Sequence, residues 1–86
     1  MNKVYLIGKV ISKIEFKFII NSKNKSVAMF EIETIDKQKI KIEANNELAD
    51  FAYSKLDKGS VVAIEGYIKS NIVKTEKIDK VYKYLS

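Results

Sequence analysis

Residues 45–67 read NNELADFAYSKLDKGSVVAIEGY and combine a helical pattern with a strand pattern. In the first half, apolar residues recur three or four positions apart, which places them on one face of a helix. These residues are Leu48, Phe51, Ala52 and Leu56. Asn45 or Asn46 can cap the start of this helix, and Gly59 can supply a left-handed residue at its end. The β-branched run that begins at Ser60 predicts a strand directly after the helix.

Strand patterns account for the rest of the chain. Residues 3–14 carry apolar side chains on both faces, as in a long bent strand, and Gly8 allows the backbone to curve or to approach another strand closely. A second piece of this strand spans residues 14–20. The remaining strands are expected over residues 27–35, 39–43, 60–69 and 76–85. They are connected by a polar, basic loop at 21–26, three residues at 36–38 and a short return at 70–75. Five strands with a helix between the third and the fourth predict an all-β fold with one helix, a five-stranded OB-fold barrel, as a single domain over residues 1–86.

The connection at 36–38 also predicts how its two strands pair. Ala28, Phe30, Ile32 and Thr34 share one face, which we expect to form the core. A three-residue connection keeps apolar side chains opposite each other, with Thr34 facing Ile40, Ile32 facing Ile42 and Glu33 facing Lys41.

Composition excludes most catalytic chemistry. The chain has no cysteine and no histidine, which removes the usual nucleophile arrangements and zinc sites. Its three glycines are isolated and form no phosphate-binding loop. We therefore expect no enzyme activity, no catalytic residues, no metal site, no cofactor and no small-molecule substrate.

Charge and length point to macromolecular partners. The net charge is +5, and all sixteen basic residues are lysines, which bind phosphate but give little base-specific readout. With 86 residues the chain buries a small core, so a partner subunit is plausible.

The longest apolar run near the start, Val4 to Ile7, is too short for a secretory signal or a membrane span. We expect a cytoplasmic protein without a membrane partner.

Several segments resemble the bacterial single-stranded DNA-binding protein family, which includes the primosomal replication protein as a shorter relative. The similar segments are MNKVYLIGKV at 1–10, AMFEIET at 28–34 and NELADFAYSKLDKGSVVAIEGYI at 46–68, in the same order and spacing as in the family. The resemblance implies an OB-fold, a homodimer or homotetramer, and binding of single-stranded DNA in replication, repair or recombination. The chain departs from the family because it has no tryptophan and places Lys39 and Lys41 where the family has aromatic residues on its outer sheet face.

The candidate nucleic-acid contacts are lysines and exposed rings. They are Lys9, Lys17, Phe18, Lys39, Lys41, Tyr67 and Lys69. Each has an alternative role. Phe18, like Phe16, shares parity with the apolar Ile14, which favours core packing over base stacking. Tyr67 fits a subunit contact equally well, and Glu31 and Glu33 on the neighbouring strand can neutralise the lysines of the third strand.

Three functions are consistent with these residues. The first is non-catalytic, weakly sequence-specific binding of single-stranded DNA, with lysines on phosphates and a few rings stacking on bases. The second is a protein-interaction or assembly module that does not bind nucleic acid. The third is binding of single-stranded RNA.

Overall fold

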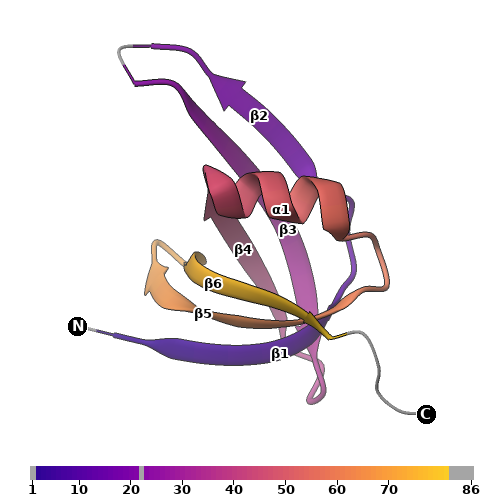
Figure 1. The fold of residues 1–86 in the computed structure, drawn as a ribbon. Helices are drawn as coiled ribbons and strands as arrows, with labels where there is room; N and C mark the ends of the chain where they lie inside the picture. The colour runs from indigo at the N-terminus through magenta and orange to yellow at the C-terminus, as the bar shows by residue number, and fades with distance from the viewer. Residues whose placement is uncertain (1, 22, 82–86) are drawn as a thin grey trace.

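A computed structural model describes residues 2–21 and 23–81 of the chain. The described residues form six strands and one helix (Figure 1). The elements are β1 (Val4–Val10), β2 (Glu15–Ile19), β3 (Lys25–Thr34), β4 (Lys39–Asn45), α1 (Glu47–Lys55), β5 (Val61–Lys69) and β6 (Ile72–Val81). Within the described residues, no helix has the length and apolar character needed to cross a bilayer.

Five of the strands close into a barrel. The sheet has the order β1-β5-β6-β4-β3-β2, and a further pairing of β1 with β3 joins the ends of the five-stranded ring. Among the described strands, β2 pairs with β3 alone, and together they extend as a hairpin beyond α1 (Figure 1). The predicted OB-fold with one helix is confirmed.

The predicted first strand is two strands, because the chain leaves the barrel ladder after Val10. Ser12 breaks the alternation: its hydroxyl accepts the Glu31 N–H at 2.9 Å and donates to the Lys13 carbonyl at 3.0 Å. These bonds replace ladder bonds at the bend. Counted along the chain, the helix therefore follows the fourth strand and not the third.

The core forms where the inner faces of the barrel meet α1. Inner-face residues of the strands are buried, including the predicted Ala28, Phe30 and Ile32, whereas Thr34 is only partly buried. On the helix side, Ala49, Ala52 and Leu56 are the buried residues, and Leu48 and Phe51 pack partly against the core. Small side chains on α1 let the helix lie close to β3 and β4.

The ends of the helix differ from the prediction. Asn46 occupies the capping position with a φ of 56°, but its side chain makes no capping hydrogen bond. The helix start is instead held by the buried Ser26, whose hydroxyl lies 3.2 Å from both the Asn46 carbonyl oxygen and Asp50 Oδ1. At the other end Leu56 is already extended, and Gly59 (φ 101°) lies in the following turn and not at the helix terminus.

The register of β3 and β4 is shifted by two residues from the prediction. Ile32 lies opposite Ile40, and Glu31 lies opposite Lys41. The turn closes one residue earlier than expected, because the Thr34 N–H donates to the Gln38 carbonyl and Lys37 adopts a left-handed φ of 69°. A shift of two residues preserves the faces, so the core residues were assigned to the correct side.

The connection between β5 and β6 is also shorter than predicted. Ser70 and Asn71 both have positive φ, 55° and 65°, as a tight two-residue hairpin turn requires. β6 therefore begins at Ile72, four residues earlier than expected, and the predicted end of this strand at 82–85 lies outside the described residues.

Candidate nucleic-acid interface

The barrel presents a surface of outward side chains, here called the outer face. It is formed by the residues of β2, β3 and β4 that point away from the core and by the paired ends of β5 and β6. Its members are Glu15, Lys17, Val27, Met29, Glu31, Glu33, Lys39, Lys41, Glu43, Asn45, Tyr67, Lys69, Ile72 and Lys74. Five of the seven predicted contact residues belong to this face.

Strand pairing brings two of the predicted lysines into one row. Lys41 on β4 lies opposite Ile72 on β6, which in turn lies opposite Lys69 on β5. Two strand spacings separate the backbone positions of the two lysines, which is roughly 10 Å. The parallel pairing of β4 with β6 thus joins segments almost thirty residues apart into one basic row.

A second row alternates in charge. Lys9 on β1 lies opposite Glu33 on β3, which lies opposite Lys39 on β4. Lys17 stands apart on the β2–β3 hairpin, opposite Val27. The structure therefore spreads the predicted lysines along the outer face and onto β1.

Among the residues that the structure describes, carboxylates on this face pair with one of its lysines, Lys74. Lys74 Nζ lies 2.8 Å from Glu43 Oε1. Partial burial alone raises the pKa of Glu43, but hydrogen bonds from Lys74 and Asn45 outweigh it and hold the pKa below its usual value. Within residues 2–21 and 23–81, neither Lys39 nor Lys41 forms an ion pair, although Glu33 and Glu31 lie opposite them. Both of these ammonium groups remain available to an anion.

The two predicted rings lie on different sides of the sheet. Tyr67 is 38% exposed and lies on the outer face, opposite Lys74. Phe18 is 57% exposed, so its expected core packing is wrong. It lies opposite Ser26, on the helix side of the hairpin and away from the lysines. Phe16 on the same side does pack against the core, and its ring centre lies 4.7 Å from that of Tyr53.

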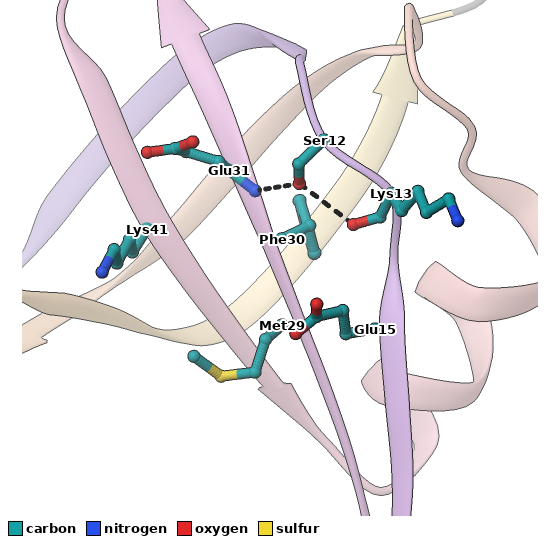
Figure 2. A pocket seen from close by; sticks show the side chains of 7 residues that line it. All are labelled: Ser12, Lys13, Glu15, Met29, Phe30, Glu31 and Lys41. Atoms are coloured by element: carbon teal, nitrogen blue, oxygen red, sulfur yellow. Dashed lines mark hydrogen bonds between the residues drawn. The ribbon is translucent and has the colours of Figure 1, made fainter.

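A hollow of about 420 Å³ opens on the outer face beside the bend between β1 and β2 (Figure 2). We call it the outer hollow, and it is lined by Ser12, Lys13, Glu15, Met29, Phe30, Glu31 and Lys41. Of these seven lining residues, Lys41 alone is among the contacts predicted from the sequence. Ser12 interrupts the apolar alternation of the first strand and Met29 has outward parity in β3, but neither signal locates a hollow without the fold.

Within the described part of the chain, no three carboxylate, thiol or imidazole groups lie together as a metal site requires. The interface is thus built of lysines, carboxylates, Tyr67 and the thioether of Met29.

Comparisons with known proteins agree with this architecture. The Single-strand binding protein family matches residues 1–85. The single-stranded DNA-binding protein of Thermus aquaticus superimposes with a TM-score of 0.88 at 16% identity, over 100% of this chain and 43% of that one. The second OB-fold domain of replication protein A from Methanococcus maripaludis gives 0.77 at 19% identity, covering 95% and 86% of the two chains.

A third solved structure has nearly the same length as this chain. It is the small single-stranded DNA-binding protein of Streptomyces coelicolor, with a TM-score of 0.75 at 15% identity, over 94% of this chain and 93% of that one. A search of the curated proteins found no sequence that matches. At these low sequence identities, the three structures show only that they share the fold of this chain. The match to the family, in contrast, spans nearly every residue. The chain therefore belongs to the Single-strand binding protein family.

Proposed function

We propose that this protein is a non-catalytic binder of single-stranded DNA that acts in replication, repair or recombination in the cytoplasm. The observation that supports this most is the basic row of Lys41 and Lys69, next to the exposed ring of Tyr67 on the same outer face. Lysines neutralise phosphates, and one base stacks on Tyr67.

Binding of this kind is mainly electrostatic and depends little on sequence. Lysine is a point charge that suits phosphate and lacks the planar fork with which arginine reads guanine. Lys17, Lys39, Lys41 and Lys69 supply four cations on the outer face. Each phosphate they neutralise contributes about −0.7 to the slope of log affinity against log salt.

Titration of labelled oligo-dT by fluorescence anisotropy over a salt series tests the proposal. We expect a slope of about −3 if all four lysines contact phosphates, with binding strongest at low salt. An absence of any anisotropy change at micromolar protein and low salt would rule out nucleic-acid binding. Competition with oligo-U separates a preference for DNA from one for RNA.

We also propose that the protein assembles as a homodimer or homotetramer through β1. On the outer side of this strand, Tyr5 and Ile7 are 71% and 65% exposed. β1 pairs with β3 only over Gly8–Val10, so from Val4 to Ile7 one edge has no strand partner in the described residues. An open edge with exposed apolar side chains favours pairing with a second copy.

Light scattering measures this assembly directly. We expect a defined oligomer for the native chain and a monomer for the double variant Tyr5→Lys/Ile7→Lys, because two charges make the apolar contact unfavourable. Ile35→Lys is the control, since Ile35 is 98% exposed in the β3–β4 turn. A native monomer at high concentration would refute the assembly while leaving DNA binding untouched.

A further inference from the structure

Two carboxylates line the outer hollow, where they repel the phosphates of a bound strand. Glu31 lies beside Lys41 on one side of the hollow, and Glu15 lies beside Met29 on the other (Figure 2). In the described residues neither carboxylate forms an ion pair. A bound strand would meet unpaired negative charge here, which repels its phosphates but accepts hydrogen bonds from amino groups.

Hydrogen-bond donors are scarce in the same hollow. The Ser12 hydroxyl donates its proton to the Lys13 carbonyl, so it has none left for a ligand. The ammonium group of Lys13 is directed away from Glu31 and Lys41 (Figure 2). The ammonium group of Lys41 lies in the basic row, where a phosphate would occupy it.

Bases differ in how they match a site rich in acceptors. In a single strand, the exocyclic amino group of cytosine or adenine donates to a carboxylate, whereas the one ring donor of thymine, N3–H, lies between two carbonyl oxygens that a carboxylate repels. The volume of about 420 Å³ lies in the range of small-molecule sites. The thioether of Met29 is a polarisable surface on which the flat base can pack.

We propose that the outer hollow holds one base of the bound strand, and that Glu15 and Glu31 make it favour cytosine or adenine over thymine. This inference rests on the proposed function, since it concerns the same outer face. Lys41 holds a phosphate, the adjacent base enters the hollow over Met29, and its amino group donates to a carboxylate.

Comparison of oligo-dC with oligo-dT of equal length tests the inference, because the two share a backbone and differ only in the base. We expect oligo-dC to bind roughly five- to tenfold more tightly near neutral pH. The double variant Glu15→Gln/Glu31→Gln removes two negative charges. It should bind both oligonucleotides more tightly, and the ratio of their affinities should fall to about one.

Glu33→Gln is the matched control, because Glu33 lies on the outer face of the same strand but outside the hollow. It should raise both affinities and leave their ratio unchanged. Equal binding of the two oligonucleotides by the native protein, or an unchanged ratio in the double variant, would overturn the base preference while DNA binding stands. If neither oligonucleotide binds at low salt, the proposed function itself fails.

Discussion

Replacing Gly66 by alanine is expected to remove most of the free energy that stabilises the fold. A Cβ at this position would overlap the backbone oxygen of Lys74 and would lie 3.0 Å from its carbonyl carbon. The obstacle is the backbone of the paired strand β6, at the register shift between Glu65 and Gly66, so it cannot rotate away as a side chain would. We expect a loss of at least about 3 kcal/mol, which is most of the stability of a domain this small.

Urea denaturation followed by circular dichroism measures the effect, and the other two glycines calibrate it. At Gly59 the space is open and only the positive φ of 101° is unfavourable, so Gly59→Ala should cost about 1 kcal/mol. At Gly8 a Cβ would lie 2.8 Å from the Glu33 backbone oxygen, which predicts an intermediate loss. Gly66→Ala with a midpoint equal to that of Gly59→Ala would contradict the close approach of β5 and β6.

These glycines illustrate how far the sequence predicts the fold. A glycine inside an alternating strand already indicates close approach of another chain segment, and Gly8 does lie between β3 and β5. Gly66 stands in a similar alternating strand, but the bulge in the β5–β6 ladder beside it follows from strand pairing and cannot be read from the alternation. The β3–β4 turn was predicted one residue too late for a similar reason, since lysine rarely adopts the left-handed φ that Lys37 has. At the β5–β6 turn, Ser70 and Asn71 are typical turn residues, but the sequence does not show that the turn ends with them.

The candidate site was predictable only in part. Alternation along β3 and β4 correctly put Lys39 and Lys41 outside and the apolar residues inside. Their proximity to Lys69 depends on the parallel pairing of β4 with β6, a contact that no local pattern reveals. The predicted core packing of Phe18 is wrong because parity indicates only the side of the strand on which a ring lies. Parity does not indicate that the β2–β3 hairpin extends beyond the core.

The double variant Lys39→Gln/Lys41→Gln is expected to weaken binding of oligo-dT by roughly one to two orders of magnitude at about 50 mM salt. Loss of two phosphate contacts should also reduce the steepness of the salt dependence by about 1.4. Both side chains are exposed, and neither forms an ion pair in the described part of the chain, so folding should be unaffected. Anisotropy titrations at several salt concentrations give both quantities.

A second variant separates a local interface from the general attraction of a basic protein. Lys55→Gln/Lys58→Gln removes an equal number of positive charges, but from the end of α1 and the turn after it, outside the outer face. Glutamine and lysine have similar helix propensities, so α1 should persist. If DNA passes over the outer face, this variant should lose only a small part of the affinity, since its lysines contribute through the screened field and not through contact. Equal losses in the two double variants would mean that net charge alone attracts DNA, and the outer face would then have no special role.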